Sequence, residues 1–160
     1  MISTACQSND SASSGRGTLE VLKAPPPQEE AIDPFLVDYD PNLEIAVSEM
    51  TIHPSGILWH DDIEGTGPAL EVDQTAVIRY TGWFPDGLAF DSTAAGTTFS
   101  FRVGAGEVID GLDVGIVGMK LGGKRKLIIP PEFGYGDGGL GAVPPNSILV
   151  FGIELVEILP

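Results

Sequence analysis

Short runs of alternating hydrophobic and polar residues dominate the chain from Gly56 onward, and such alternation is typical of β-strands. β-Branched and aromatic residues are concentrated in these runs, which Gly, Pro or Asp residues bound. In the last run, four apolar residues share one face, because successive side chains of a strand point to opposite sides: Leu149, Phe151, Ile153 and Leu155. We expect strands over residues 74–84, 97–103, 124–129 and 148–158.

One segment of this region, residues 110–117, has the features of a short helix. Asp110 stands near its start, where the helix dipole favours a negative charge, and Gly118 stands where a C-terminal cap is expected. Because strands dominate, this helix must cover one face of the sheet. The pattern therefore predicts an α+β fold that is mainly β, an antiparallel twisted sheet curled around one short helix.

The first 50 residues lack this alternation. Up to about residue 30 the chain is rich in Ser, Gly, Asn and Pro, which is typical of a disordered segment, and the prolines 25–27 stiffen it locally. Apolar residues return over residues 35–50, which we interpret as a lead-in that either drapes over the domain or forms a loosely held arm. The expected organisation is a disordered tether and lead-in over residues 1–50, followed by one domain over residues 51–160.

The composition limits the partners of the protein. The chain has 160 residues and a net charge of −15, which argues against nucleic acid and against an anionic membrane surface as partners. Its single cysteine excludes an internal disulfide and a multi-cysteine metal site. No apolar run approaches the roughly 20 residues that are needed to span a bilayer.

Three patterns resemble sites for other chemistry, and each has a feature that argues against it. Residues 118–124 have the spacing of a phosphate-binding loop, but Arg125 replaces the metal-binding Ser or Thr and a strand follows. Residues 38–49 resemble a calcium loop that lacks the Gly of its sharp turn. The two histidines, His53 and His60, have no cysteine or carboxylate cluster at metal-ligand spacing.

Two pairs of carboxylates, Asp61 with Asp62 and Asp110 with Asp113, are best interpreted as a solvated edge, since nothing places them across a cleft. A nucleophilic Cys-His arrangement is not expected either, because Cys6 lies in the predicted tether. We therefore expect neither a metal ion nor another cofactor.

Six aromatic residues come from different strands and loops, so only folding brings them together: Tyr80, Phe90, Phe99, Phe101, Tyr135 and Phe151. One interpretation is an ordinary hydrophobic core. Buried tyrosine hydroxyls need partners, however, and Asp91 beside an apolar cluster must be hydrogen-bonded or hydrated. The second interpretation is therefore an apolar hollow with a few polar groups, which is typical of a small-ligand or peptide pocket.

The motifs around these residues resemble, in order and spacing, those of the FKBP-type peptidyl-prolyl isomerases, from about Gly56 to the C-terminus. Six pieces carry the resemblance: residues 77–82 around Tyr80, Phe90-Asp91-Ser92 after the turn 85–87, Phe99 with Phe101, residues 106–111 around Val108 and Ile109, residues 133–136 around Tyr135, and Phe151. The resemblance implies an FKBP-like fold and the isomerisation of X–Pro peptide bonds without a cofactor.

It also implies roles for individual residues. In that family the matching residues line the proline pocket, which implies catalytic roles for Tyr80, Phe90, Asp91, Phe99, Ile109, Tyr135 and Phe151. Substrate contacts are implied for Phe101, Glu107, Val108, Leu112 and Val143. The match for the Ile109 N–H binds a carbonyl of the peptide or macrolide, and the match for the Tyr135 hydroxyl binds a further carbonyl.

The sequence departs from the best-known members of the family at two places. Leu112 stands where many members have a tryptophan at the floor of the pocket, so we expect a less aromatic and roomier floor. The glycine-rich loop over residues 137–140 is one residue shorter, which alters the contacts that this loop makes.

The resemblance implies proline-containing polypeptides as partners and macrolides of the FK506 and rapamycin type as ligands, and we expect a monomer. A chaperone-like or peptide-binding module with little turnover is one alternative, and a metal-binding protein is another. The presence of Tyr80, Asp91, Ile109 and Tyr135 favours an isomerase over the first. The scarcity of His and Cys argues against the second.

The N-terminal residues bear on where the protein works. Residues 3–6, Ser-Thr-Ala-Cys, followed by a Ser- and Asn-containing stretch, resemble the end of a bacterial lipoprotein signal with Cys6 as the lipidated residue. Neither a basic region nor an apolar stretch precedes Cys6 in this sequence. The expectation is the bacterial cell envelope, with a lipid anchor if the signal is real, and the alternative is a cytoplasmic enzyme with an incidental cysteine.

Overall fold

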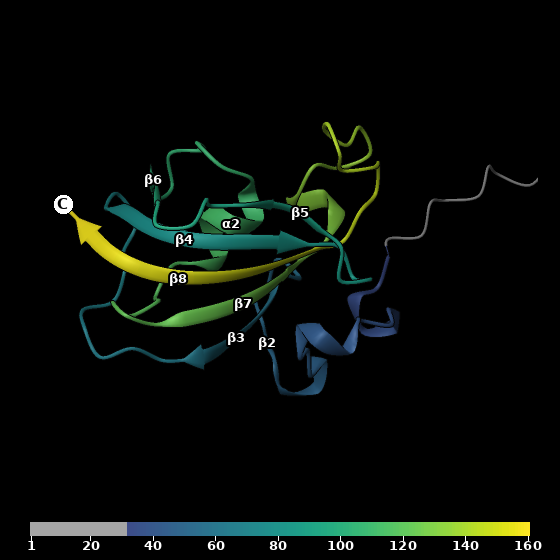
Figure 1. Cartoon of the computed structure of the whole chain (residues 1–160), viewed down its shortest axis with the longest axis horizontal. Coiled ribbons are helices and arrows are strands. Elements are labelled where there is room, and N and C mark those ends of the chain that lie inside the picture. Colours follow the sequence, from purple (N-terminus) through teal and green to yellow (C-terminus); the bar gives the residue numbers. More distant parts are fainter. Residues whose placement is uncertain (1–31) are drawn as a thin grey trace, which may run out of the picture. The chain divides into compact units, whose positions relative to one another are not determined.

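The computed structural model describes residues 32–160, which form one sheet with a single described α-helix against it (Figure 1). The strands are β2 (Thr51–Ile52), β3 (Leu58–Ile63), β4 (Thr75–Trp83), β5 (Ala89–Ser92), β6 (Phe99–Arg102), β7 (Lys124–Ile129) and β8 (Leu149–Leu159). The helix is α2 (Asp110–Gly115). Short 3₁₀ turns lie at Pro34–Leu36, Pro41–Leu43, Val47–Glu49 and Pro131–Phe133.

All strand pairs are antiparallel, and the sheet has the order β2-β3-β7-β8-β4-β5, with β6 pairing with the first half of β4. The long last strand, β8, lies between β7 and β4 and curves along its length (Figure 1). The prediction of an antiparallel twisted sheet around one short helix is confirmed.

α2 packs closely on β7 because two of its residues are glycines. A Cβ atom at Gly115 would lie 2.8 Å from Cδ1 of Leu127, and one at Gly111 would overlap the side chain of Ile129. Apolar residues of the helix and of the strands together fill the space between them, and Ile116 and Leu127 are fully buried there. We call this side of the sheet the helix face.

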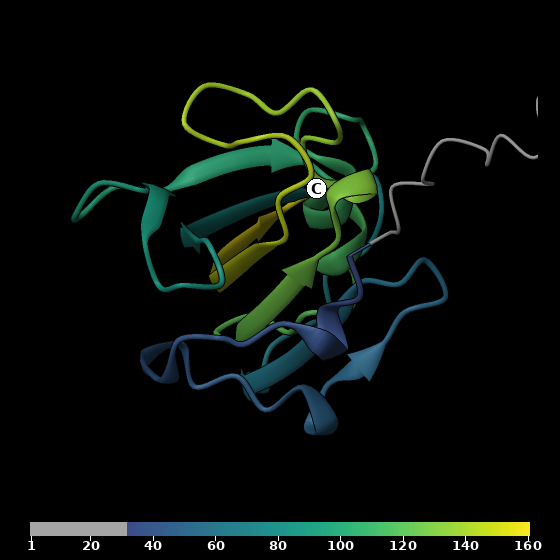
Figure 2. The same cartoon turned by 90° about the vertical axis from the view of Figure 1, so that its right-hand side faces the viewer.

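The opposite side, which we call the outer face, is covered at one end by the residues that precede β2. Leu58, Ile128 and Ile148 form a second buried cluster there, and the partly buried residues packed on it are Val37, Tyr39, Ile45, Val47 and Met50. Two hydrogen bonds fasten this segment: Asp40 N–H donates to the Pro85 carbonyl at 2.7 Å, and Lys126 Nζ donates to the Leu43 carbonyl at 2.8 Å. Figure 2 shows the segment running beneath β7. Over residues 37–50 the chain thus lies on the domain.

The four predicted strands are all present, and their ends lie within two residues of the expected positions. The helix ends at Gly115 with Ile116 as its cap, so the expectation that Gly118 caps it is wrong. Gly118 instead adopts φ 83° and donates its N–H to the Leu70 carbonyl, in a turn that needs left-handed backbone. The alternation of the sequence does not predict β5, which is short and mostly exposed.

The expectation of a solvated edge at Asp61 is wrong. Its carboxylate accepts two hydrogen bonds from the buried Arg125 guanidinium, at 2.6 Å from Nε and 2.9 Å from Nη2. Arg125 Nη1 also donates to the carbonyls of Gly115 and Val117, and the Trp59 ring centroid lies 3.9 Å from Cζ of Arg125. This pair depends on the register of β3 against β7, which the sequence alone does not reveal.

Candidate functional site

A hollow of about 190 Å³ opens on the helix face, and nine of the predicted site residues line it. They come from β4, β5, β6 and β8, from the turn that enters α2, from α2 itself, and from the loop after β7. The lining residues are Tyr80, Asp91, Phe99, Glu107, Val108, Ile109, Leu112, Tyr135 and Phe151. Residues from across the whole domain therefore converge as the resemblance implies.

The sheet register explains why the rings meet. Gly82 on β4 lies opposite Phe151 on β8 and opposite Asp91 on β5. A Cβ atom at Gly82 would come within 2.7 Å of the Phe90 ring and 3.1 Å of the Phe151 ring. The absence of a side chain at Gly82 therefore lets these two rings approach, with 5.7 Å between their centroids.

Tyr80 joins the aromatic wall to the polar side of the hollow. Its ring centroid lies 5.9 Å from that of Phe99, edge to face, and 6.0 Å from that of Phe151. Its hydroxyl donates to Asp91 Oδ2 at 2.7 Å, while Ser92 N–H donates to Asp91 Oδ1 at 2.9 Å. Burial, followed by the hydrogen bond to Asp91, raises the pKa of Tyr80 to about 12. The hydroxyl is therefore protonated at neutral pH and holds the carboxylate in place.

The Tyr135 hydroxyl and the Ile109 N–H belong to residues that line this hollow and have no hydrogen-bond partner within residues 32–160. Burial, followed by the charge of Asp91, raises the pKa of Tyr135 above its ordinary value. Ile109 is the N-cap residue of α2, and its N–H likewise donates to no acceptor in this part of the chain. Both groups are available to donate to carbonyl oxygens of a bound molecule.

The carboxylate of Glu107 stabilises the backbone next to the hollow. Its Oε2 accepts a hydrogen bond from Arg102 N–H at 3.0 Å, which connects the turn before α2 to the end of β6. Asp113 acts similarly, since its carboxylate accepts from Gly104 N–H and Gly106 N–H. These two carboxylates therefore position the turn that carries Val108 and Ile109.

Three predicted residues lie behind the lining. Phe101 is 2% exposed and its ring centroid is 5.8 Å from that of Phe99, so it supports the Phe99 ring from the core. Phe90 packs between Phe84 and Phe151, and Val143 is buried in the same core cluster. Leu112 both lines the hollow and belongs to the core, with 4% of its surface exposed. Cys6 lies outside the described residues.

Two residues support the site although neither is among the predicted ones. Thr93 Oγ1 donates to the Tyr80 carbonyl at 3.4 Å, and its own N–H donates to the same carbonyl at 3.0 Å. Phe84 packs on Phe90 with 5.0 Å between ring centroids. A threonine and one more phenylalanine near a strand carry no distinctive sequence signal, and only the pairing of β4 with β5 reveals what they do.

A larger open groove of about 400 Å³ lies on the outer face, but threonine, glycine, alanine and charged side chains dominate its lining. The smaller hollow has the aromatic walls and the unpaired donors, so we assign the candidate active site to it. Within residues 32–160 no cluster of His, Cys, Asp or Glu has the arrangement of a metal site. The same part of the chain contains no helix long and apolar enough to cross a membrane.

Comparison with protein families gives one match. A family model described as FKBP-type peptidyl-prolyl cis-trans isomerase matches residues 67–156, which is more than half of the chain. All nine residues that line the hollow fall within this range.

Two individual proteins with similar sequences come from a fungus and from a plant. "FK506-binding protein 4" of Aspergillus fumigatus is 44% identical over 103 residues, and the match covers 64% of this chain and 21% of that protein. "Peptidyl-prolyl cis-trans isomerase FKBP15-3" of Arabidopsis thaliana is 44% identical over 117 residues, covering 71% of this chain and 82% of that protein. This chain thus spans about a fifth of the length of the Aspergillus relative.

Solved structures show the same fold. The crystal structure of AtFKBP13 has a TM-score of 0.64 and 40% sequence identity, and the match covers 68% of this chain and 98% of that one. The crystal structure of FkpA from Escherichia coli has a TM-score of 0.64 and 38% identity, covering 69% of this chain and 52% of that one.

Proposed function

The chain belongs to the FKBP-type peptidyl-prolyl cis-trans isomerase family, and we propose that it catalyses rotation about X–Pro peptide bonds in the hollow between Tyr80, Phe151 and Ile109. The observation that carries this proposal is the combination of aromatic walls with two unpaired donors, the Tyr135 hydroxyl and the Ile109 N–H. An apolar site with a few converging polar groups is what a prolyl ring and its flanking carbonyls require.

The reaction needs no nucleophile. Rotation about the peptide bond has a barrier of about 18–20 kcal/mol because amide resonance must be broken, and for X–Pro the uncatalysed step takes tens to hundreds of seconds. The twisted amide is less dipolar than the planar one, so a water-poor pocket favours it over the planar ground state. An acceleration of about 10⁴–10⁶-fold corresponds to roughly 5.5–8 kcal/mol of transition-state stabilisation.

The residues divide this work between them. The rings of Tyr80, Phe99 and Phe151 enclose the prolyl group, with Phe90 holding Phe151 from behind. The Ile109 N–H donates to one substrate carbonyl, and the Tyr135 hydroxyl donates to another. Asp91 accepts the hydrogen bond of the Tyr80 hydroxyl, so the Tyr80 ring presents its apolar surface to the substrate.

A protease-coupled assay on a proline tetrapeptide tests the proposal. The full chain should accelerate cis-to-trans conversion without added metal or nucleotide, a chelator should have no effect, and a macrolide of the FK506 type should inhibit. A rate equal to the uncatalysed background, with the protein shown to be folded, would refute the isomerase assignment.

The alternative is a chaperone-like or peptide-binding module of the same fold with little turnover. Leu112 is the observation that favours it, because an aliphatic side chain occupies a lining position where the family often has an aromatic ring. Macrolide or peptide binding in the absence of catalysis would identify this case. The proposed partners in either case are proline-containing polypeptides, and the proposed form is a monomer.

For location we infer the bacterial cell envelope. The Ser-Thr-Ala-Cys sequence that ends at Cys6 supports it, as does the composition of the residues that follow. In the native host, lipid on Cys6 detected by mass spectrometry and partition of the protein with membranes are the expected results. An unmodified Cys6 in a protein that stays in the aqueous fraction would favour the cytoplasm.

A further inference from the structure

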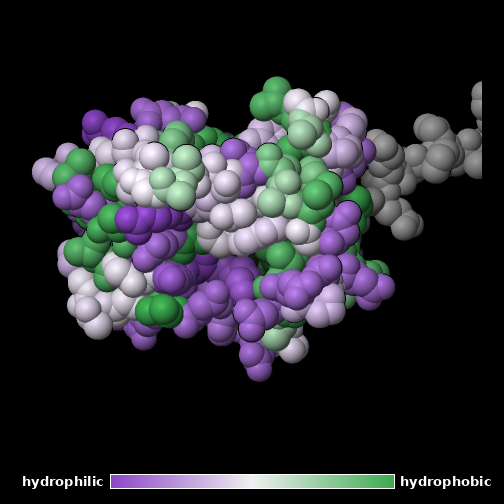
Figure 3. Space-filling model, viewed as in Figure 1, coloured by the Kyte–Doolittle hydropathy of each residue, from purple (hydrophilic) through white to green (hydrophobic). Residues whose placement is uncertain are grey.

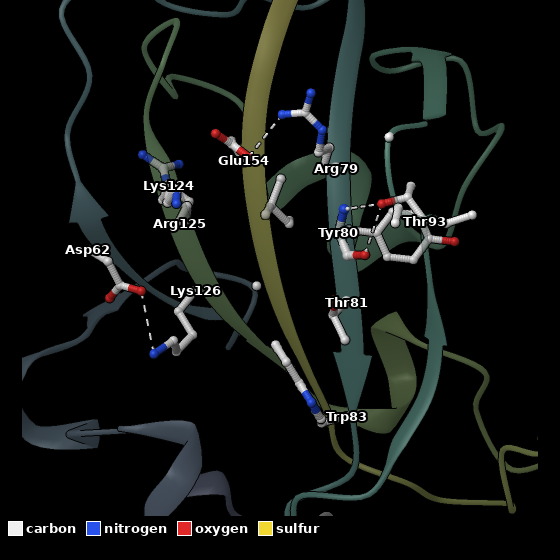
Figure 4. A pocket seen from close by; sticks show the side chains of 15 residues that line it. Asp62, Arg79, Tyr80, Thr81, Trp83, Thr93, Lys124, Arg125, Lys126 and Glu154 are labelled. Carbon is white, nitrogen blue, oxygen red and sulfur yellow. Dashed lines mark hydrogen bonds and ion pairs between the residues drawn. The ribbon is translucent and has the colours of Figure 1, made fainter. Parts of the chain in front are cut away.

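The groove on the outer face, which we call the outer groove, lies on the side of the sheet away from α2 (Figure 4). Its floor is formed by Thr81 on β4 and Gly152 on β8, and one side is formed by Lys124 and Lys126 on β7. The loop over residues 93–96 forms the other side. At about 400 Å³ it is large enough for several residues of an extended peptide.

The strand register places the side chains of the outer groove in rows across the sheet. Lys124, Glu154 and Arg79 are direct neighbours across β7, β8 and β4, so a carboxylate stands between two cations. In the next row, Gly152 lies between Lys126 and Thr81. Same-face residues on a strand are about 7 Å apart, which sets the distance between the rows.

Trp83 supplies an apolar surface over the second row. A Cβ atom at Gly152 would lie 3.1 Å from Cζ3 and 3.2 Å from Cη2 of the Trp83 ring, so the indole extends across the glycine. The Trp83 side chain also lines a separate hollow of about 280 Å³, together with residues such as Leu43 of the lead-in. Figure 4 shows Trp83 at one end of the groove, away from the Arg79–Glu154 pair.

The outer groove is cationic in an acidic protein. The chain has 8 Lys and Arg against 23 Asp and Glu, yet three basic side chains, Arg79, Lys124 and Lys126, meet only two acidic ones, Asp62 and Glu154, at the groove. Other residues that line it, such as Arg125, Tyr80 and Ile153, turn their side chains to the helix face.

Of the three basic side chains at the outer groove, one has no ion-pair partner within residues 32–160. Arg79 pairs with Glu154 at 3.2 Å, and Lys126 is engaged by Asp62 at 3.4 Å and by the Leu43 carbonyl. Lys124 is exposed and has no ion-pair partner within residues 32–160. A bound carboxylate near Lys124 and Arg79 would therefore add a partner without displacing one.

We propose that the outer groove binds an extended acidic segment of a client polypeptide, with a carboxylate on Lys124 and Arg79 and an apolar side chain on Trp83 above Gly152. The row spacing fits a carboxylate and an apolar residue two positions apart, because residues i and i+2 of an extended chain lie on one side about 7 Å apart. Charge complementarity selects this ligand, since the acidic remainder of the surface repels it. The site is separate from the proline hollow and does not require catalysis.

The test uses the full ¹⁵N-labelled chain and the proline-free peptide acetyl-Glu-Ser-Leu-Ser-Glu-Ser-Leu-amide, with the same peptide carrying Gln for Glu as its control. Chemical shifts should change at Thr81, Lys124 and Gly152 and at the Trp83 indole N–H, and not at Ile109 or Tyr135. Binding should weaken at high salt, and the Gln peptide should bind at least tenfold more weakly.

A charge-matched pair of variants isolates the groove. Lys124→Glu with Arg79→Gln changes the net charge by −3 at the groove, and Lys120→Glu with Arg102→Gln makes the same change elsewhere on the surface. The two control side chains are exposed and paired with Glu64 and Asp73. The groove variant should lose at least tenfold in affinity for the Glu peptide, and the control variant less than threefold.

Any of four results with the peptides would overturn the proposal: no binding of the Glu peptide, equal binding of the Gln peptide, equal losses in both variants, or shift changes centred on Ile109 and Tyr135. A fifth result, concentration-dependent shifts of the groove residues in the free protein, would also overturn it, because a second copy of the chain would then be the occupant. Circular dichroism of each variant establishes that a loss of binding is not a loss of folding.

Discussion

At the scale of single residues, the hollow depends on one hydrogen bond that ties an aromatic ring to a carboxylate. Tyr80 and Asp91 belong to neighbouring strands, and their bond of 2.7 Å fixes the ring between Phe99 and Phe151. Asp91 itself is exposed, so the bond contributes to the shape of the site more than to the stability of the fold. Catalysis and stability should therefore separate at this residue.

Asp91→Leu removes the acceptor and creates no cavity. We expect kcat/KM to fall about tenfold, which corresponds to about 1.4 kcal/mol in the transition state, while the free energy of unfolding changes by less than about 1 kcal/mol. The tetrapeptide assay and urea denaturation measure the two quantities. Glu157→Leu, at another exposed carboxylate, should leave kcat/KM unchanged, and a wild-type kcat/KM in Asp91→Leu would remove Asp91 from the site.

Leu112→Trp tests the residue that both lines the hollow and belongs to the core. With 4% of Leu112 exposed, a larger ring should overpack the helix face and cost about 1–3 kcal/mol of stability. If Leu112 forms the floor, macrolide affinity should change at least fivefold as well, which calorimetric titration would measure. A stability loss with unchanged affinity would assign Leu112 to the core alone.

The sequence motifs identify all the residues that line the hollow but do not separate them from those behind. Phe99 and Phe101 share a motif and a face of β6, yet Phe99 lines the hollow while Phe101 is buried beneath it. Phe101 belongs to the buried core cluster and Phe99 does not, a difference that residue spacing does not encode. The role of Gly82 cannot be predicted from the sequence either, since the rings that need its missing side chain come close only when β4, β5 and β8 pair.

At the scale of elements, Arg125 connects β7, β3 and the end of α2. Its side chain is 4% exposed and pairs with Asp61 through two nitrogens. It also donates to the carbonyl of Gly115, the last helical residue, at 3.0 Å and to that of Val117 beyond it at 3.1 Å. Arg125→Met leaves the carboxylate and both carbonyls without their donor. We expect a loss of about 2–4 kcal/mol in the free energy of unfolding, measured by urea denaturation.

Arg79→Met is the matched control for that change. Arg79 also pairs with a carboxylate across strands, but the two side chains are 46% and 37% exposed, so the expected loss is below about 1 kcal/mol. Adding Asp61→Leu to Arg125→Met should recover part of the stability, because the unpaired charge is then gone. Equal losses for the two single variants would show that burial does not set the strength of these pairs.

Strands were predictable from alternation where one face is buried, as in β8 and β4, because the buried face demands apolar residues. No buried face constrains the sequence of β5, since only one of its four residues is even partly buried. This strand forms because the turn at 85–88 brings it against β4. The Arg125–Asp61 pair was hidden because its partners are 64 residues apart and meet only through strand register.

For the molecule as a whole, the three tyrosines make the free energy of unfolding depend on pH in the alkaline range. Burial and, second, the charge of Asp33 raise the pKa of Tyr39 to about 12, the pKa of Tyr80 is also about 12, and that of Tyr135 is raised. A raised folded-state pKa means that the native state keeps protons which the unfolded chain, titrating near 10, has lost. The free energy of unfolding should therefore be unaffected by tyrosines below pH 10 and fall as the pH rises from about 10 to 12.

Tyrosinate absorbance and urea denaturation across this range check the prediction together. Tyr39→Phe should reduce the alkaline loss of stability, because one shifted group is removed. Titration of all three tyrosines near pH 10 in the folded protein, with no lag behind the unfolded chain, would contradict the raised pKa values.

The segment before β2 determines where the stable unit of the chain begins. Leu58 and Ile128 are fully buried on the outer face under side chains such as Ile45 and Val47. A chain that starts at Thr51 would expose this cluster, so we expect it to lose about 2–4 kcal/mol, where each kcal/mol lowers the melting temperature by about 4–8 °C. A chain that starts at Ile32 should keep the melting temperature of the full chain, because it retains the covering residues.

Two substitutions in the full chain separate packing from truncation. Ile45→Ala removes a side chain of the cover, whereas Leu36→Ala changes a residue that is 84% exposed and lies outside the cluster. Scanning calorimetry should show a lower melting temperature for Ile45→Ala and an unchanged melting temperature for Leu36→Ala. If the Thr51 chain melts with the full chain, residues 32–50 are only a lead-in, and the outer face is stable without a cover. If it melts lower while the Ile32 chain does not, the structural domain begins within residues 32–50 rather than at residue 51.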